Sequence, residues 1–160
     1  MIKPCTGLSP EKTAELAYQA AVGGVDIIKD DELVANPPHC PLIERVKAVM
    51  PAIQNADRIK GEKTLFAFNI TDRADRIKEN ALKALEAGAN CLMLNYATVG
   101  LDAARMITED PEIDVPILGH SDYVGASTAC EWCGTSTKLM NAKLPRLAGL
   151  DMIIALSPYG

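Results

Sequence analysis

Four consecutive charged residues, Lys29-Asp30-Asp31-Glu32, directly follow an apolar run at residues 25–28. An apolar run of this length is typical of a buried strand in a parallel sheet. Charge at the end of a buried strand is costly unless the charges pair or bind a cation. Because alternate residues of a strand share a face, Lys29 and Asp31 should point the same way, with Glu32 able to turn in where the strand ends. Two convergent carboxylates suit Mg²⁺, which prefers oxygen ligands; a solvated acidic loop is the alternative.

Polar residues also follow the other apolar runs of the chain, at 65–70, 91–94, 115–118 and 152–156. In parallel β/α folds, ligands bind outside the carboxyl ends of the strands, so these residues are candidates for one shared site. Together with two residues near the amino terminus, the candidates are Lys3, Cys5, Asn69, Thr71, Asn95, Tyr96, His120, Ser121, Asp122, Ser157 and Tyr159. A lone histidine is more often structural, but His120 stands at the end of its run rather than inside it, which favours a role in the site.

The elements that would position these residues recur along the chain. A small residue, a glycine, an apolar residue and Asp or Asn occur in that order around Gly24, Gly88 and Gly149, each time at the start of an apolar run. Each interval between them holds one further apolar run, which gives a strand–helix unit about every 30 residues, the period of β/α architecture. The glycines should end helices in the left-handed conformation. We therefore predict an α/β fold with about six strand–helix units, the first of them truncated.

The helices between the strands are marked by capping residues and by apolar spacing. Ser9 and Pro10 predict a helix start, with Ser9 as the N-cap and Pro10 in the first turn. A second helix should span 42–56, where Pro51 is expected to end or kink it. No segment is of low complexity and no linker indicates a second domain, so we expect a single domain.

Charge and composition exclude several classes of function. The 160 residues carry 16 Lys and Arg against 21 Asp and Glu, a net charge of −5. This balance argues against a nucleic-acid backbone as the main partner. No apolar stretch approaches the length of a membrane span, and residues 1–5 lack the apolar region of a signal peptide, so we expect a soluble cytoplasmic protein.

The cysteines indicate reduced thiols rather than a disulfide framework, because there are five of them and no secretory signal. Cys91 opens an apolar run and is expected to be a small buried hydrophobe. Cys130 and Cys133 form a single C-x-x-C pair with no second pair and no histidine nearby. A structural zinc site needs about four ligands, so the pair favours neither a zinc site nor a redox dithiol.

Several of the candidate residues belong to longer motifs that are shared with a known family. The motifs are Ile2-Lys3-Pro4-x-x-Gly7-Leu8-Ser9, Gly23-Gly24-Val25-Asp26-x-x-Lys29-Asp30-Asp31-Glu32, Asn69-x-Thr71, Gly119-His120 and Lys143-Leu144-Pro145-Arg146-Leu147-Ala148-Gly149-x-Asp151. They extend over essentially the whole chain, and the cluster of one lysine and three acids is distinctive. The chain resembles the RuBisCO large-subunit family, and within it the RuBisCO-like proteins of form IV.

This resemblance implies a (β/α)8 TIM barrel, of which residues 1–160 supply about six strand–helix units. The amino-terminal domain and the last strands of the family are absent from these residues, so we expect the chain to be part of the catalytic barrel of a longer enzyme. Family members work as dimers with the site at the subunit interface, which implies a homodimer for the full-length form.

The resemblance also implies roles for individual residues. The metal lysine of the family, here Lys29, is carbamylated by CO2 and binds Mg²⁺ together with Asp31 and Glu32. Lys3 and His120 match the catalytic residues that move protons or lie near the substrate. We expect burial and the nearby cation to lower the pKa of Lys3, so that it can act as acid and base. The residues expected to contact the substrate or support the metal ligands are Asn69, Asn95, Ser121 and Ser157.

Departures from the family pattern separate the chain from the carboxylase. Cys5 replaces a second lysine of the first motif, Ser121 replaces an arginine that grips a phosphate, and Val124 replaces a second histidine. These differences favour the non-carboxylating branch, whose members enolise, isomerise or decarboxylate phosphorylated sugar-like substrates.

Our leading hypothesis is therefore a Mg²⁺-dependent enolase or isomerase that removes a proton next to a carbonyl of a small phosphorylated ketose-like substrate. Three alternatives stay open. The first is ribulose-bisphosphate carboxylase activity, and the second is a non-catalytic relic or scaffold that kept the fold. The third is an aldolase that forms a Schiff base through Lys3 or Lys29.

Overall fold

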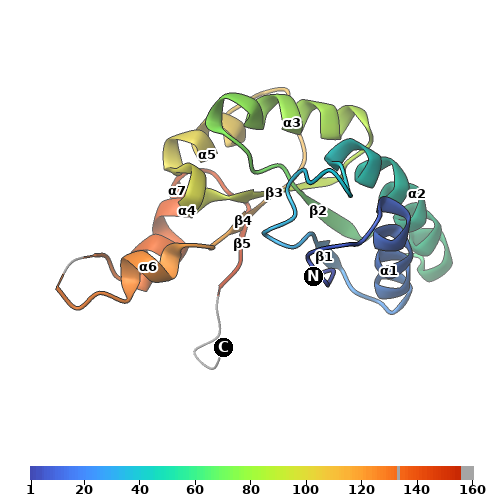
Figure 1. Ribbon diagram of the computed structural model, residues 1–160, viewed down its shortest axis with the longest axis horizontal. Coiled ribbons are helices and arrows are strands. Elements are labelled where there is room, and N and C mark those ends of the chain that lie inside the picture. The colour runs from blue at the N-terminus through green and yellow to red at the C-terminus, as the bar shows by residue number, and fades with distance from the viewer. Residues whose placement is uncertain (133, 156–160) are drawn as a thin grey trace.

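The computed structural model describes residues 1–132 and 134–155 and contains one sheet of parallel strands in sequence order. Helices cover its outer face, and the sheet curls so that the carboxyl ends of the strands gather at one edge (Figure 1). The strands are β1 (Ile27–Lys29), β2 (Leu65–Asn69), β3 (Cys91–Asn95), β4 (Ile117–His120) and β5 (Met152–Ile153). Each apolar run from residue 25 onward thus contains a strand, which confirms the predicted α/β class.

The helices alternate with the strands along the chain. They are α1 (Pro10–Val22), α2 (Leu42–Lys60), α3 (Ala74–Glu86), α4 (Tyr96–Val99), α5 (Leu101–Thr108), α6 (Val124–Thr128), a π-helical turn η1 (Leu139–Lys143) and α7 (Leu144–Leu147). The hydroxyl of Ser9 accepts a hydrogen bond from the backbone N–H of Lys12 at 3.3 Å, which confirms Ser9 as the N-cap of α1. Among the described residues, no helix is both long and apolar enough to cross a membrane.

Two expectations about these elements were wrong. The truncated first strand near Lys3 does not form, so the described part of the chain has five strands rather than six. Its remnant is one hydrogen bond, from the backbone N–H of Ile2 to the carbonyl of Lys29 at 3.0 Å. The second concerns the end of α2, which was expected at residue 56: the helix continues to Lys60, so Pro51 does not end it. Pro51 and Lys47 are both exposed, so the carbonyl of Lys47, which Pro51 cannot satisfy, can bond to water.

Apolar side chains bury both faces of the sheet, because successive residues of a strand point to opposite sides. On β2, Phe66 and Phe68 pack into the large core beneath the helices, whereas Ala67 joins a smaller cluster on the inner face. Cys91 belongs to the inner cluster and is fully buried. Burial raises the pKa of its thiol to about 12, so Cys91 is the buried hydrophobe that the sequence predicts.

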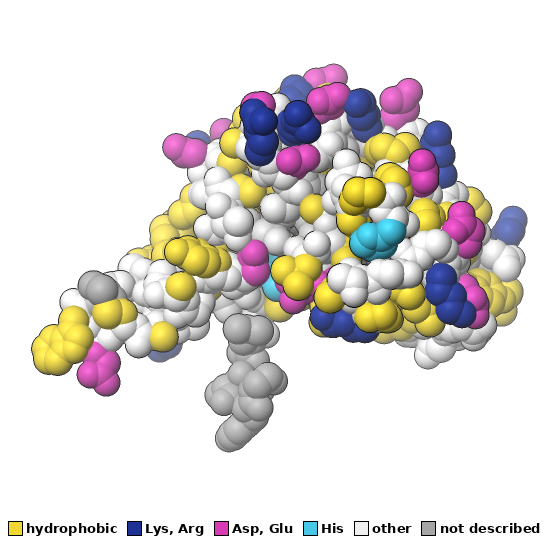
Figure 2. Space-filling model, in the orientation of Figure 1, with side chains coloured by type: hydrophobic (Ala, Val, Ile, Leu, Met, Phe, Trp, Pro, Cys, Tyr) yellow, Lys and Arg dark blue, Asp and Glu magenta, His cyan; other side chains and the backbone are white. Residues whose placement is uncertain are grey.

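One face of the molecule carries charges of both signs. On the face shown in Figure 2, described Lys and Arg side chains are interspersed with Asp and Glu side chains along the helix-covered edge of the molecule. Such mixing, together with the net charge of −5, is unlike the concentrated basic surface of a nucleic-acid-binding protein.

The three glycines of the repeated pattern have left-handed backbones, with φ of +95° at Gly24, +100° at Gly88 and +89° at Gly149. This confirms the prediction that they terminate the preceding helices. A side chain would meet different surroundings at two of them. A Cβ atom at Gly149 would lie 2.6 Å from Oγ1 of Thr108, whereas a Cβ atom at Gly88 would have nothing within 4 Å.

We expect Gly149→Ala to lower the free energy of unfolding by about 2–4 kcal/mol, because overpacking adds to the strain of a left-handed alanine. Gly88→Ala is the matched control. It carries the backbone strain alone and should cost about 1–2 kcal/mol. Urea unfolding of both variants measures the difference, and equal losses would show that Thr108 moves aside freely.

Candidate active site

The residues that follow β1 face two directions at the carboxyl edge of the sheet. Lys29 and Asp31 lie on the inner side with side chains 10% and 1% exposed, whereas Asp30 points toward the helices and pairs with Arg45 at 3.0 Å. This alternation is the geometry expected of an extended segment. The Nζ atom of Lys29 donates to the carbonyl of Asp30 at 2.9 Å and to Oε2 of Glu32 at 3.1 Å.

The carboxylate of Glu32 contacts two of the other predicted site residues. Its Oε2 atom accepts the hydrogen bond from Lys29 and lies 3.4 Å from Nε2 of His120. Burial raises the pKa of the Glu32 carboxyl, but its own backbone amide and Lys29 outweigh this effect and hold the pKa below its usual value. Glu32 is therefore an ionised acceptor between a lysine and a histidine.

Asp31 forms an ion pair through its Oδ2 atom with the ammonium of Lys3. Burial raises the pKa of Asp31, but the hydrogen bonds from Lys3 and from the backbone amide of Leu33 have a larger, opposite effect, so the pKa is lowered overall. The side chain of Lys3 is 53% exposed. The contact with Asp31 outweighs the lowering effect of burial and raises the pKa of Lys3, whereas burial and a nearby cation were expected to lower it. Lys3 reaches the site from a surface segment rather than from a buried strand.

His120 is held in one tautomer by the backbone. Its Nδ1 atom accepts a hydrogen bond from the N–H of Asp122 at 3.1 Å, so the neutral ring carries its proton on Nε2, which faces Glu32. Burial lowers the pKa of His120, and the charge of Lys29 lowers it further. At neutral pH the ring is accordingly a neutral donor toward the carboxylate.

Two asparagines hold the main chain of the turn at Asp31 and Glu32. Asn69 donates from Nδ2 to the carbonyls of Glu32 and Asp31 at 3.0 and 3.3 Å. Asn95 donates from Nδ2 to the carbonyl of Glu32 at 3.0 Å. These amides belong to the ends of β2 and β3, so neighbouring strands fix the turn that follows β1.

The structure places several of the other predicted residues. Thr71 lies beside the site, where its hydroxyl accepts from the backbone N–H of Asn95 at 3.0 Å. The hydroxyl of Tyr96 points away and lies 2.9 Å from Oδ1 of Asn141, so Tyr96 does not join the site. Ser121 is buried, and its hydroxyl has no hydrogen-bond partner among the described residues. The positions outside the described residues are Cys133, Ser157 and Tyr159.

The carboxylate oxygens of the site are ligands of the kind that hard cations prefer, but two lysines pair with them in the structure. Within the described residues, no three His, Cys, Asp or Glu side chains come close enough together to hold a metal ion. The two carboxylates, of Asp31 and Glu32, are instead neutralised by Lys3 and Lys29.

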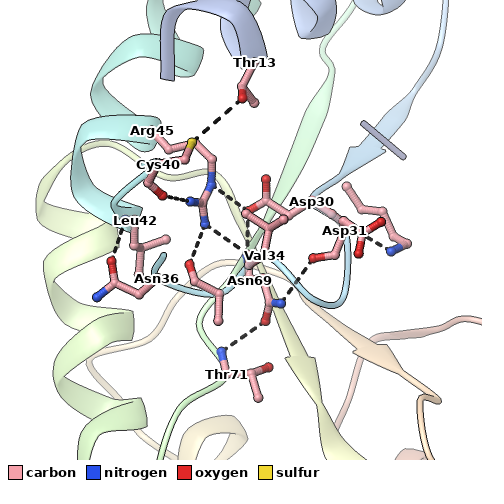
Figure 3. Close-up of polar contacts among 12 residues, drawn as sticks. Thr13, Asp30, Asp31, Val34, Asn36, Cys40, Leu42, Arg45, Asn69 and Thr71 are labelled. Atoms are coloured by element: carbon pink, nitrogen blue, oxygen red, sulfur yellow. Dashed lines mark hydrogen bonds and ion pairs between the residues drawn. The ribbon is translucent and has the colours of Figure 1, made fainter. Parts of the chain in front are cut away.

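Sequence reasoning missed the buried ion pair between Asp30 and Arg45. A signal was present, because Arg45 stands among Leu42, Val46 and Val49 on the buried face of α2. An arginine at a core position of a helix predicts a buried acidic partner. Figure 3 shows the guanidinium lying between the Asp30 carboxylate and carbonyls of the segment that leads into α2.

Relatives in sequence cover the chain from end to end. Residues 1–157 match the family described as ribulose bisphosphate carboxylase large chain, catalytic domain. A ribulose bisphosphate carboxylase-like protein of Archaeoglobus fulgidus is 49% identical over 160 residues, which are 100% of this chain and 37% of that protein. A 2,3-diketo-5-methylthiopentyl-1-phosphate enolase of Geobacillus thermodenitrificans is 40% identical over 148 residues, 92% of this chain and 36% of the enzyme.

Solved structures agree with the sequence matches. A RuBisCO-like protein from Alicyclobacillus acidocaldarius superposes with a TM-score of 0.91 at 33% identity, over 99% of this chain and 40% of that one. A dimeric archaeal RuBisCO from Hyperthermus butylicus gives a TM-score of 0.87 at 34% identity, over 94% of this chain and 35% of that one. The chain spans little more than a third of the curated relatives, and its curled sheet corresponds to a part of their barrel. It therefore belongs to the family of RuBisCO large-chain catalytic domains, of which it forms a portion.

Proposed function

We propose that the protein containing this chain is a RuBisCO-like, Mg²⁺-dependent enolase or isomerase that acts on a small phosphorylated ketose-like substrate. The observation that carries this proposal is the convergence of Lys29, Asp31 and Glu32 with two proton-bearing groups, Lys3 and His120. Two relatives that match most of this chain support it, since one is named a RuBisCO-like protein and the other an enolase of a phosphorylated diketone.

The charges of the cluster support a carbamylated Lys29. Two lysines and two carboxylates sum to zero as they stand in the structure. The Lys29 ammonium first loses a proton, and reaction of the resulting amine with CO2 forms an N–C bond and releases a second proton, so that one positive charge is replaced by one negative charge. The cluster would then carry a charge of about −2, and three oxygen-bearing groups would face one volume, which suits a hard divalent cation.

The remaining residues supply proton transfer and orientation. When bound, Mg²⁺ polarises a substrate carbonyl and stabilises the negative charge that develops on it. Lys3 is the candidate base for the neighbouring carbon, and it can act as a base only when Asp31 no longer holds its ammonium. His120 presents an Nε2 proton that it can donate to a substrate oxygen or pass on. Asn69 and Asn95 hold the backbone at Glu32 through its carbonyl.

The same reasoning disfavours carboxylation of a bisphosphate. Ser121 offers a buried hydroxyl where the carboxylase places an arginine, so a second phosphate would lack its charged partner. We further propose a homodimer for the full-length protein, since the archaeal RuBisCO from Hyperthermus butylicus is described as dimeric. The cytoplasmic location stays a prediction.

Titration with Mg²⁺ in the presence and absence of bicarbonate tests the proposal. We expect bicarbonate to strengthen Mg²⁺ binding about tenfold or more, because the carbamate binds the metal directly. Mutation of residues that only support metal ligands already changes metal affinity about 10- to 100-fold. Lys78→Ala is the control, since Lys78 is a lysine that pairs with carboxylates, those of Asp110 and Glu112, away from the site. Affinity that does not respond to bicarbonate would instead favour a non-catalytic scaffold.

A further inference from the structure

We propose that Arg45 is a positioning residue of the active site, which acts through Asp30 to fix the turn that carries Asp31 and Glu32. Neither Arg45 nor Asp30 faces the inner side of the sheet, so their role is indirect. That the turn carries metal ligands rests on the proposed function. That Arg45 fixes the turn does not, and it can be tested by itself.

The guanidinium of Arg45 bonds to both ends of the segment between β1 and α2. Its side chain is 1% exposed, and its Nε atom donates to Oδ2 of Asp30 at 3.0 Å. From the same group, Nη1 donates to the carbonyl of Cys40 at 2.6 Å and Nη2 to that of Ala35 at 2.8 Å. One rigid, planar group thus connects the start, the middle and the end of the segment (Figure 3).

Asp30 transmits this hold to the sheet. The Oδ2 atom that pairs with Arg45 also accepts the backbone N–H of Asn69 at 2.9 Å, and the backbone N–H of Asp30 donates to the carbonyl of Ala67 at 3.1 Å. The carboxylate therefore extends the pairing of β1 with β2 by a side-chain bond. Asp31 and Glu32 follow directly, so their starting point is fixed from the helix side.

On the inner side, two side-chain amides hold the main chain of the turn at Glu32, and Lys29 donates to the carbonyl of Asp30 and to the Glu32 carboxylate. Asn69 and Asn95 donate to the carbonyl of Glu32, each at 3.0 Å, and they define its height above the strand ends. Without the outer pair, the turn could rotate about these bonds and move the carboxylates of Asp31 and Glu32 relative to Lys29. Hydrogen bonds from beyond the ligands set ligand geometry in metal sites generally.

Arginine is required at this position because of its shape as well as its charge. The guanidinium carries five donors in a planar fork, whereas a lysine ammonium is a compact charge on a flexible stem. Arg45→Lys keeps the charge next to Asp30 but cannot reach Asp30, Ala35 and Cys40 together. This variant therefore separates charge balance from positioning, and Asp30→Asn tests the other partner with nearly the same shape.

The test compares Arg45→Lys with wild type in the full-length protein by two measurements. Amide hydrogen exchange at Leu33, Val34 and Asn69 follows the turn, because these amides bond to Asp31 or Asp30. Binding of Mn²⁺, used as a probe for Mg²⁺ in the presence of bicarbonate, follows the site. We expect exchange at these three amides to rise about tenfold or more and Mn²⁺ binding to weaken about 10- to 100-fold. Exchange in α3 should not change, and Asp30→Asn should repeat the pattern.

The matched control is Arg73→Lys, because Arg73 makes an exposed two-bond pair with Asp75 at 3.1 and 2.9 Å. It should change neither measurement. Unchanged exchange at the turn in Arg45→Lys would overturn the proposal, and so would faster exchange throughout the chain, which indicates a general stabilising role. If wild type shows no Mn²⁺ binding that depends on Lys29, the proposed function fails, while the exchange at the three amides still decides whether Arg45 holds the turn.

Discussion

Lys29→Ala is expected to reduce Mg²⁺-dependent proton exchange on a phosphorylated ketose by about 10³-fold or more. The substitution removes the amine that CO2 would convert into a ligand, and it leaves Asp31 and Glu32 to hold the cation alone. Glu32 also loses its hydrogen bond from Lys29 at 3.1 Å. The measurement is the loss of deuterium from labelled substrate, followed by NMR with the full-length protein.

The control for this prediction is again Lys78→Ala, which should exchange at the wild-type rate. Circular dichroism of both variants shows whether each is folded. Because Lys29 lies at the end of a strand and its ammonium reaches solvent-accessible groups of the site, its truncation should leave the sheet intact. Exchange that survives Lys29→Ala would refute the assignment of Lys29 as the carbamylated metal ligand.

A Schiff-base aldolase would also lose activity in Lys29→Ala, so a second observation must separate the two chemistries. An aldolase lysine forms a covalent imine with a carbonyl substrate, and borohydride reduces it to a stable adduct. We expect no adduct at Lys3 or Lys29. In the proposed site the nitrogen of Lys29 is bound in a carbamate, and the contact with Asp31 raises the pKa of Lys3 and favours its ammonium form, so neither nitrogen is free to attack a carbonyl.

The composition of the site could be predicted from the sequence because parallel topology does most of the positioning. Once the apolar runs are assigned to strands of one sheet, their carboxyl ends must meet at one edge, and Lys29, Asn69, Asn95 and His120 follow. In the structure, contacts link all four through Glu32. His120 was predicted to lie in the site for the same reason, because it stands at the end of β4.

What the sequence could not predict depends on packing between distant segments. The exposure of Lys3, and with it the raised pKa, follows from how residues before α1 cross the sheet edge. The local pattern contains no information on that path. α2 continues past Pro51 because the carbonyl of Lys47, which Pro51 cannot satisfy, lies on the exposed side of the helix. That depends on the orientation of α2. Arg45 could have been noticed on its apolar face, but its several bonds to one segment required the three-dimensional arrangement.

Arg45→Met is expected to lower the free energy of unfolding by about 3–5 kcal/mol, the cost of leaving one charge of a buried pair without its partner. Methionine fills similar volume, so the loss arises from charge and hydrogen bonds rather than from a cavity. Burial already raises the pKa of Asp30 against the opposing charge of Arg45, and removal of the arginine should raise this pKa further. Urea unfolding at neutral and at mildly acidic pH measures both effects.

The sign of the pH dependence follows from that pKa. A carboxyl whose pKa is higher in the folded than in the unfolded chain stabilises the fold at low pH and loses this contribution as pH rises through the folded value. Arg45→Met should therefore be least destabilised at acidic pH, where Asp30 binds a proton. The double variant Asp30→Asn/Arg45→Met removes both charges and should recover much of the stability at neutral pH, since neutral replacements of a buried pair cost far less than a broken one. A double variant as unstable as Arg45→Met alone would show that the bonds of Arg45 to Cys40 and Ala35, rather than its charge, account for the loss.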